Sequence, residues 1–278
     1  MAMRNAVRQI LNLPMMGGSQ VFLGAPWLPT LLGLAPESWK ERIALELLAL
    51  SPHYFYRTSA NRDLGHLEFL QSERARNTGS RQHLIDGVVR PFLRPEFTVL
   101  DYGCGPGHLA FAVSASVRSV IACDISSGVL ACAGILNRRD NIQYLPVPPN
   151  GGLKICDQSV DLVYSFAVIQ HVDDTVFQQI LCELWRVMRN GARGLCHVVL
   201  NGAYGWKTEN DWREDRSLKG RAKWAVGLHC FSREPARIIA MAEAVGFSEV
   251  HIQPIDVPGL EDDVAHQHLL HFVKHLAG

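Results

Sequence analysis

Three glycines alternate with other residues directly after a short apolar run. The segment 99–102 (VLDY) leads into Gly103, Gly105 and Gly107. Glycines that follow a buried strand let the backbone turn sharply and let a ligand approach where a Cβ atom would collide. Because open α/β sheets bind ligands at the carboxyl ends of their strands, this stretch predicts a cofactor site.

The residues around this turn indicate which kind of cofactor it suits. A dinucleotide fingerprint requires G-x-G-x-x-G, and His108 occupies the place of the third glycine. Asp101 at the strand end would repel a pyrophosphate, but it suits a cationic ligand. S-adenosylmethionine carries a sulfonium and an ammonium group and has no phosphate. The local charge therefore favours S-adenosylmethionine, with a nicotinamide-dependent reductase as the competing hypothesis.

A second carboxylate follows at the end of the next apolar run. The segment 119–124 (SVIACD) ends at Asp124, 17 residues after Gly107. A carboxylate at this place can accept hydrogen bonds from both ribose hydroxyls of a nucleoside cofactor. A tight turn with a surface aspartate is the alternative, but the order of strand, Asp101, glycines, helix, strand and Asp124 favours a binding site.

A histidine stands where a methyl or other group acceptor would lie. His171 falls in the segment 170–174 (QHVDD), in the loop after a predicted strand. A histidine with nearby carboxylates can be held in one tautomer and made more basic, which suits removal of a proton from a hydroxyl. The alternatives are a solvent-exposed histidine and one that only packs on the cofactor.

The segment 201–232 predicts a substrate-side insertion between a strand and the last helix. Tyr204 and Trp206 are its candidate acceptor-binding residues, because aromatic rings offer flat apolar surface with polar edges. Packing of the insertion against the domain is an equally good reading of these aromatics. His229 is a second candidate base. Histidines 266, 268, 271 and 275 cluster near the end, but no acidic or cysteine ligand is placed beside them, so no metal site is assigned.

The elements that would position these residues alternate regularly from residue 97 onward. The predicted strands are 97–101, 119–124, 142–145, 160–165, 195–200, 248–254 and 268–273. The predicted helices are 107–116, 126–136, 175–188 and 234–244, and Asn190-Gly191 predicts a turn. This alternation predicts a doubly wound, mostly parallel α/β sheet covered on both faces.

Residues 1–90 follow a different pattern. Helices are predicted at 36–50, 63–76 and 81–89, which indicates a helical extension or cap. The chain therefore divides into this extension and a cofactor-binding domain at 91–278. Membrane contact through residues 1–35 is a less favoured alternative to core packing, because no strong amphipathic face is evident there.

Composition and charge narrow the classes of partner. Lys and Arg together number 27, as do Asp and Glu, so the formal net charge is zero and no nucleic-acid partner is expected. The seven cysteines are dispersed and odd in number, which favours a reducing compartment. No apolar run is long enough to span a bilayer. We expect a cytoplasmic protein. These features are also compatible with a homodimer.

The region from Phe97 to about Val250 resembles the class I S-adenosylmethionine-dependent methyltransferase domain. The matching segments are 99–110 (VLDYGCGPGHLA), 120–126 (VIACDIS), 157–172 (DQSVDLVYSFAVIQHV), 181–194 (LCELWRVMRNGARG) and 231–247 (FSREPARIIAMAEAVGF). The resemblance implies a seven-stranded Rossmann-like sheet whose last strand runs antiparallel. It covers a little over half of the chain and does not include residues 1–90.

The same resemblance implies roles for individual residues. Asp101 and the glycines at 103, 105 and 107 would line the methionine moiety, Asp124 would bind the ribose, and Ile125 would lie against the adenine. Ser165 and Phe166 would complete the cofactor site. Many family members carry a Gly-Asp-Ala-like segment where this chain reads PNGG at 149–152, and Asn150 would replace its adenine-binding aspartate.

The loop after the fourth predicted strand bears on the reaction. Segment 165–168 reads SFAV and lacks the Asn/Asp-Pro-Pro-Tyr/Phe motif typical of amide- and base-nitrogen methylation. The resemblance therefore implies O-methylation of a hydroxyl on a small-molecule, glycan or lipid-like acceptor, with a histidine general base. The alternatives are N- or C-methylation of a small metabolite and a non-catalytic binding or scaffold protein.

Overall fold

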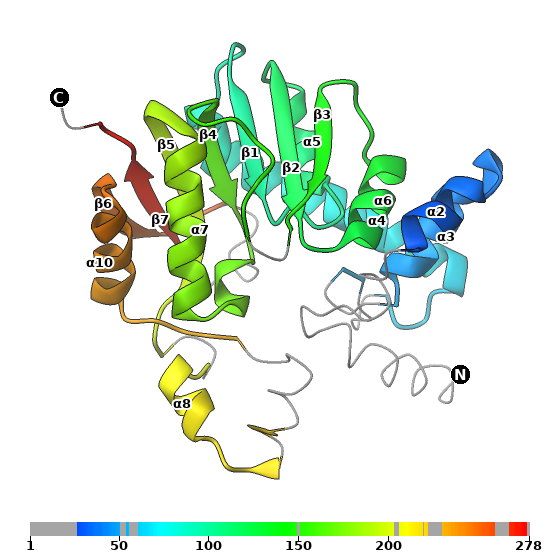
Figure 1. The fold of residues 1–278 in the computed structure, drawn as a ribbon. Helices are drawn as coiled ribbons and strands as arrows, with labels where there is room; N and C mark the ends of the chain where they lie inside the picture. Colours follow the sequence, from blue (N-terminus) through cyan, green and yellow to red (C-terminus); the bar gives the residue numbers. More distant parts are fainter. Residues whose placement is uncertain are drawn as a thin grey trace.

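The structure is a computed structural model that describes residues 27–50, 54–55, 61–148, 151–202, 206–218, 220–221, 230–258 and 267–276. Its described strands form one sheet in the order β3-β2-β1-β4-β5-β7-β6. The strands are β1 Thr98–Tyr102, β2 Ser119–Asp124, β3 Ile142–Pro146, β4 Val160–Ser165, β5 Met188–Val199, β6 Ser248–Pro254 and β7 Gln267–Val273. Only β7 runs antiparallel to its neighbours, and its arrow points opposite to that of β4 in Figure 1. The predicted fold class is confirmed.

Helices cover both faces of this sheet (Figure 1). The helices of the described chain are α2 Leu28–Leu34, α3 Glu37–Leu48, α4 His66–Leu84, α5 His108–Ser114, α6 Ser127–Leu136, α7 Asp174–Val187, α8 Glu209–Glu214 and α10 Pro235–Val245. Residues of α7 and α10 share one buried apolar cluster with one face of the sheet, while α5 shares another cluster with the opposite face. This two-sided burial explains why strands such as β4 read as almost continuous apolar runs.

Local sequence signals set where the helices begin and end. The Ser126 side chain accepts a hydrogen bond from the Val129 N–H at the start of α6, and Asp173 accepts one from the Val176 N–H at the start of α7. These caps satisfy backbone donors that have no partner within the helix. Gly246 ends α10 in the left-handed conformation, with φ of 110°.

The N-terminal helical prediction differs from the structure in one respect. Segments 63–76 and 81–89 were expected to form separate helices, but α4 is continuous from His66 to Leu84 and then widens into a π-helical turn at Ile85–Val89. The interrupting residues 77–80 (NTGS) have weak helix propensity. Asn77 is buried, however, and its amide donates to the backbone carbonyls of Tyr54 and Glu73, so tertiary contacts hold the helix together.

The turn expected at Asn190-Gly191 is instead an irregularity inside β5. Val160 pairs with Met188, whereas Leu162 pairs with Arg193, so β5 carries extra residues opposite β4. Gly191 adopts a φ of 80°, and its N–H donates to the Lys274 carbonyl at 2.7 Å. The predicted turn is therefore wrong: Gly191 adopts a positive φ, but the pairing with the neighbouring β7 keeps the chain in the sheet.

The helices of the N-terminal extension pack beside the sheet (Figure 1). Residues of α2, α3 and α4 share a buried apolar cluster with α6, including Leu48, Phe69 and Val129. The division of the chain at residue 90 stays a prediction, since this packing is continuous with the rest. Within the described ranges, no helix combines the length and apolar composition that crossing a membrane requires.

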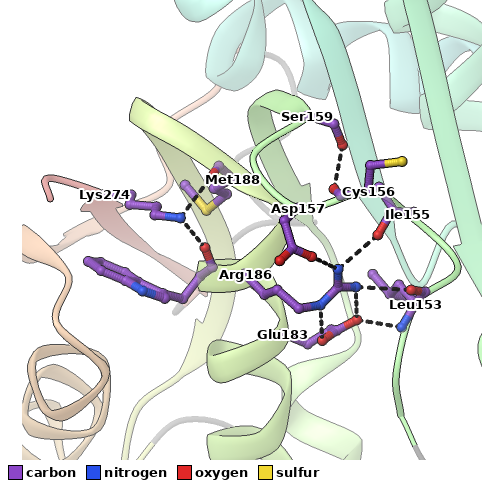
Figure 2. Close-up of polar contacts among 10 residues, drawn as sticks. Leu153, Ile155, Cys156, Asp157, Ser159, Glu183, Arg186, Met188 and Lys274 are labelled. Atoms are coloured by element: carbon purple, nitrogen blue, oxygen red, sulfur yellow. Dashed lines mark hydrogen bonds and ion pairs between the residues drawn. The ribbon is translucent and has the colours of Figure 1, made fainter.

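Arg186 and Lys274 secure the carboxyl end of α7 (Figure 2). Arg186 binds the carbonyls of Leu153 and Ile155 and the carboxylates of Asp157 and Glu183. The Lys274 Nζ donates to the Trp185 and Met188 carbonyls at 2.6 and 2.9 Å. Cations at this end satisfy free carbonyls and oppose the helix dipole. Arg186 thereby holds the segment 153–157, which leads into β4, against α7, and Lys274 joins the end of α7 to the end of β7.

Candidate functional site

The glycine turn after β1 has the backbone that its sequence predicts. Gly103, Gly105 and Gly107 all adopt positive φ angles, of 77°, 51° and 80°. A Cβ atom on Gly103 would lie 2.1 Å from the Val168 side chain, and one on Gly107 would lie 2.4 Å from the Tyr144 hydroxyl oxygen. Both the conformation and the close approach therefore require glycine.

Hydrogen bonds from neighbouring elements hold this turn in place. The backbone N–H groups of Gly103 and Cys104 both donate to the Cys123 carbonyl in β2, at 2.7 and 2.9 Å. The Asn137 side chain at the end of α6 donates to the Pro106 carbonyl at 2.7 Å. The turn is thus fixed by β2 on one side and α6 on the other, and Asn137 is a contributor that sequence reasoning missed.

Asp124 connects the end of β2 to the glycine turn. Its Oδ2 accepts from the Gly105 N–H and its Oδ1 from the Ser126 N–H, both at 2.9 Å. Burial raises the pKa of this carboxyl, while the backbone donors at 105, 125 and 126 act in the opposite direction. A carboxylate has about four lone-pair sites, so Asp124 can still accept a hydrogen bond from a ligand hydroxyl. Ile125 beside it is 59% exposed and offers an apolar surface at the rim.

Asp101 at the end of β1 is buried without a hydrogen-bond partner. The residue is 1% exposed, and neither carboxyl oxygen is hydrogen-bonded within the described part of the chain. Burial, together with the charge of Asp124, raises its pKa to about 8. The Tyr164 hydroxyl and the Ala110 N–H lie near enough to counter this shift, although neither makes a hydrogen bond of regular geometry. A buried, unpaired carboxyl beside a tight turn fits a cationic ligand group.

Tyr54 brings the N-terminal extension to this turn. One ring carbon of Tyr54 lies 3.4 Å from the place of a Cβ on Gly105. Burial raises the pKa of its hydroxyl, and the charge of Asp124 adds to this shift. The side chain also packs on the apolar cluster formed by the N-terminal helices and α6. Sequence reasoning missed Tyr54, because no motif or periodic pattern surrounds it.

The loop after β4 leads away from the same edge of the sheet. The Ser165 hydroxyl donates to the Tyr102 carbonyl at 2.8 Å, which ties β4 to the end of β1. The half-buried Phe166 ring lies 6.1 Å from that of Tyr164. Ala167 adopts a φ of 58°, unusual for a residue with a side chain, and its N–H donates to the Nδ1 of His197 at 3.2 Å. His197 is a second site residue that sequence reasoning missed.

His171 ends a single 3₁₀ turn in this loop and is half-buried. Its Nδ1 lies 3.6 Å from the Cys230 sulfur. The two carboxylates expected to orient it are engaged elsewhere, since Asp173 caps α7 and Asp174 forms ion pairs with two arginines. The Cys230 thiol is thus one side chain that lies beside the imidazole.

The end of the insertion closes over the His171 loop. The Phe231 N–H donates to the Gln170 carbonyl at 2.7 Å, and the buried Arg233 guanidinium donates to the Ile169 carbonyl and pairs with Asp174. Trp206 is half-buried, and its carbonyl accepts from the Ser232 hydroxyl at 3.1 Å. The insertion thus lies against the predicted acceptor region, beyond the end of β4 where α8 is seen in Figure 1.

Several predicted residues do not enter this geometry. Asn150, Tyr204 and His229 lie outside the described residues, as does His266 of the histidine cluster. His271 stacks on His251 with ring centroids 4.7 Å apart. Across the ranges that the structure describes, no three potential metal ligands converge.

Comparisons with known proteins were made on the whole chain. Residues 100–196 match the family model described as a methyltransferase domain. Malonyl-[acyl-carrier protein] O-methyltransferase of Yersinia pestis is 32% identical over 112 residues, which is 38% of each chain. tRNA 5-carboxymethoxyuridine methyltransferase of Escherichia coli is 27% identical over 130 residues, covering 45% of this chain and 48% of that protein. The chain thus spans less than half the length of these curated relatives.

Solved structures share the fold at low sequence identity. A Haloferax volcanii methyltransferase, solved with a methyltransferase activator, has a TM-score of 0.53 at 16% identity and covers 73% of this chain and 95% of its own. The Haemonchus contortus phosphoethanolamine N-methyltransferase 2, solved with S-adenosyl-L-methionine, has a TM-score of 0.52 at 15% identity. That match covers 88% of this chain and 61% of the other.

The unpaired Asp101 carboxyl predicts a pH-dependent stability. A carboxyl with a raised pKa favours the folded state when it is protonated, so this contribution is full below about pH 4 and is lost as the pH rises toward 8. Asp101→Asn keeps a neutral side chain at every pH. We expect the free energy of unfolding of this variant, relative to the wild type, to rise by about 1 kcal/mol per pH unit between pH 5 and 8.

Urea unfolding at several pH values measures this difference. The exposed Asp140 provides a matched control, because Asp140→Asn removes a carboxyl from the surface. The free energy of unfolding of this control should differ from that of the wild type by the same amount at every pH. A constant difference for Asp101→Asn as well would show that Asp101 ionises in the normal range.

Proposed function

We propose that the chain is a class I S-adenosylmethionine-dependent methyltransferase, which binds S-adenosylmethionine at the glycine turn and methylates an oxygen of an acceptor. The observation that carries this proposal is the pair of buried carboxyls, Asp101 and Asp124, which flank a turn of three positive-φ glycines. Asp101 has no hydrogen-bond partner of its own in the described chain, which fits a cationic cofactor.

Each residue at the turn has a distinct role in this proposal. Asp124, fixed by two backbone N–H groups, accepts hydrogen bonds from the ribose hydroxyls. Asp101 and the glycines at 103, 105 and 107 line the cationic methionine part. Ile125 packs on the adenine, and Asn150 offers its amide oxygen to the adenine amine. Ser165 and Phe166 complete the wall on the β4 side.

The reaction divides between cofactor and protein. S-adenosylmethionine supplies a methyl group that is already activated by a positively charged sulfur. The protein must hold the acceptor in line with that group, exclude water and remove a proton where the acceptor is a hydroxyl. His171 is the proposed base, with His229 as the alternative, and Tyr204 and Trp206 are proposed to bind the acceptor. The acceptor would be a small molecule, a glycan or a lipid-like compound.

A carboxylate acceptor is the second candidate. Two curated relatives are named for acceptors that carry a carboxyl group, a malonyl group in one name and carboxymethoxyuridine in the other. A carboxylate is already ionised at neutral pH and needs no base. A third relative, N-demethylindolmycin N-methyltransferase of Streptomyces griseus, keeps nitrogen methylation as an alternative. The role of His171 distinguishes a hydroxyl from a carboxylate.

We infer that residues 1–90 act as a cap on the cofactor site, because Tyr54 lies against Gly105 and near Asp124. A cytoplasmic location, a function in small-molecule biosynthesis and a homodimer also belong to the proposal. The formal net charge of zero supports a small acceptor rather than a nucleic acid.

Cofactor binding tests the proposal most simply. Isothermal titration of the wild type with S-adenosylmethionine or S-adenosylhomocysteine should give a micromolar dissociation constant. This corresponds to a free energy of binding of about −8 kcal/mol. Asp124→Ala removes the ribose acceptor, and Gly105→Val forces a branched side chain into a φ of 51° beside Tyr54, so both should abolish the heat of binding. Asp140→Ala, on the exposed surface, should bind normally.

Absence of heat with either ligand in the wild type would count against the proposal. The competing nicotinamide hypothesis would gain support if NADH quenched the tryptophan fluorescence. Intact cofactor binding without methyl transfer to any of a broad acceptor panel would instead favour a non-catalytic binding or scaffold protein.

Replacement of His171 tests the base. With a hydroxyl acceptor, His171→Ala should lower turnover by roughly 10²–10⁴ with cofactor affinity little changed, because proton removal is lost. A panel of alcohols, phenols and carboxylic acids is first screened for compounds that the wild type methylates. The rate of S-adenosylhomocysteine formation is then measured with these compounds. His83→Ala, at an exposed position in α4, is the control. Wild-type turnover with a hydroxyl acceptor would remove His171 from this role.

A further inference from the structure

His197 is a buried histidine in the strand that borders the acceptor region. It interrupts the apolar segment 195–200 (LCHVVL) and is 4% exposed. Ser165, the last residue of β4, pairs with Cys196, so His197 stands just beyond the end of β4. Its position in β5 thus brings the imidazole to the edge of the sheet at which the cofactor turn and the His171 loop also lie.

One side of this imidazole is already used. The Nδ1 of His197 accepts a hydrogen bond from the Ala167 N–H at 3.2 Å. Ala167 has a φ of 58°, so this contact holds the loop after β4 in an uncommon backbone conformation. A neutral imidazole that accepts at Nδ1 carries its proton at Nε2. The Nε2–H of His197 is therefore a hydrogen-bond donor.

The other side of the imidazole has no partner. The Nε2 is buried, and no hydrogen bond to it is found in the described part of the chain. Buried donors are almost always paired in folded proteins, because an unpaired one forfeits its hydrogen bonds to water. An unpaired donor at the edge of an active site is therefore expected to meet its partner in a bound ligand.

The charges around His197 indicate the chemistry of that ligand. Burial lowers its pKa to about 4, and positive charge on His171, His268 and Arg81 adds to the effect. The groups that act on it are thus all cationic when charged, with no carboxylate among them. The imidazole therefore stays neutral at neutral pH, while the Arg81 guanidinium contributes positive charge, which favours an anionic oxygen as the partner of Nε2–H.

We propose that His197 binds the methyl acceptor, donating the hydrogen of Nε2 to a carboxylate oxygen of that acceptor. The inference rests on the proposed function and deepens it, since it favours a carboxylate acceptor over a neutral alcohol. A neutral donor suits this position, because a buried cation without a bound anion would be costly. The Arg81 guanidinium of α4 contributes positive charge to this position.

Two isosteric variants separate this role from a structural one. Asparagine places an amide oxygen near the position of Nδ1, so His197→Asn can keep the bond from the Ala167 N–H and loses the Nε2 donor. Glutamine places an amide N–H near the position of Nε2, so His197→Gln keeps the donor and loses the Nδ1 acceptor. If His197 only held the loop, the asparagine variant would behave as the wild type.

The experiment uses the full chain saturated with S-adenosylhomocysteine and labelled with ¹⁵N-histidine. Acetate and malonate are titrated as probes, with acetamide and malonamide as neutral counterparts, and the His197 Nε2 resonance is followed. We expect the carboxylates to shift this resonance and the amides to leave it unchanged. By isothermal titration, malonate should bind about tenfold or more weakly to His197→Asn, and within about threefold of the wild type to His197→Gln.

Each outcome decides for or against the inference. Equal malonate affinity in wild type and His197→Asn would overturn it, as would equal shifts with amides and carboxylates or no shift at all in the wild type. Should His197→Asn fail to fold, the comparison of carboxylates with amides on the wild type still decides. Failure of S-adenosylhomocysteine to bind would overturn the proposed function itself, whereas normal binding with an indifferent His197 overturns this inference alone.

Discussion

Two carboxyl groups are buried side by side at the ends of neighbouring strands, and the positions of the surrounding elements follow from this constraint. Asp101 lies opposite Ala122 in the β1–β2 register, and Asp124 follows two residues later in β2. The charge of Asp124 raises the pKa of Asp101, so the two cannot both ionise cheaply without a cation between or beside them. Backbone N–H groups of the glycine turn stabilise Asp124, whereas Asp101 is left for a ligand.

The remaining architecture supports this arrangement from several directions. The Cys123 carbonyl and the Asn137 amide fix the glycine turn, and the Ser165 hydroxyl ties β4 to the end of β1. At the opposite end of β4, Arg186 holds the segment entering that strand against α7, and Lys274 binds the carbonyls at the end of α7 (Figure 2). On the acceptor side, Arg233 joins the insertion to the loop that carries His171. The site therefore rests on regular strands and on side-chain contacts to loop carbonyls.

Much of this fold could be predicted, because hydrophobic periodicity and turn chemistry agree from residue 97 onward. The bounds predicted for β2, β4 and β6 are those observed, and the glycine turn has the expected backbone. The continuous α4 could not be foreseen, since the buried contacts of Asn77 override its weak helix propensity. The irregularity at Gly191 likewise depends on β7, which is distant in sequence.

The site was predicted less completely than the fold. Tyr54 reaches the glycine turn from a segment without a motif, so only tertiary structure brings it there. His197 did leave a signal, as a histidine within an apolar strand, but its significance depends on the Nε2, which has no hydrogen-bond partner in the described part of the chain. The carboxylates near His171 in sequence are taken by α7 and by two arginines, a competition that spacing alone does not reveal.

A crystal structure of the chain with S-adenosylhomocysteine tests the central claim most directly. We expect the ribose hydroxyls to donate to the Asp124 carboxylate and the adenine to pack against Ile125. The amino group of the ligand should lie within hydrogen-bonding distance of Asp101. A ligand bound at another edge of the sheet, or one whose ribose and amino group contact neither carboxyl, would contradict it.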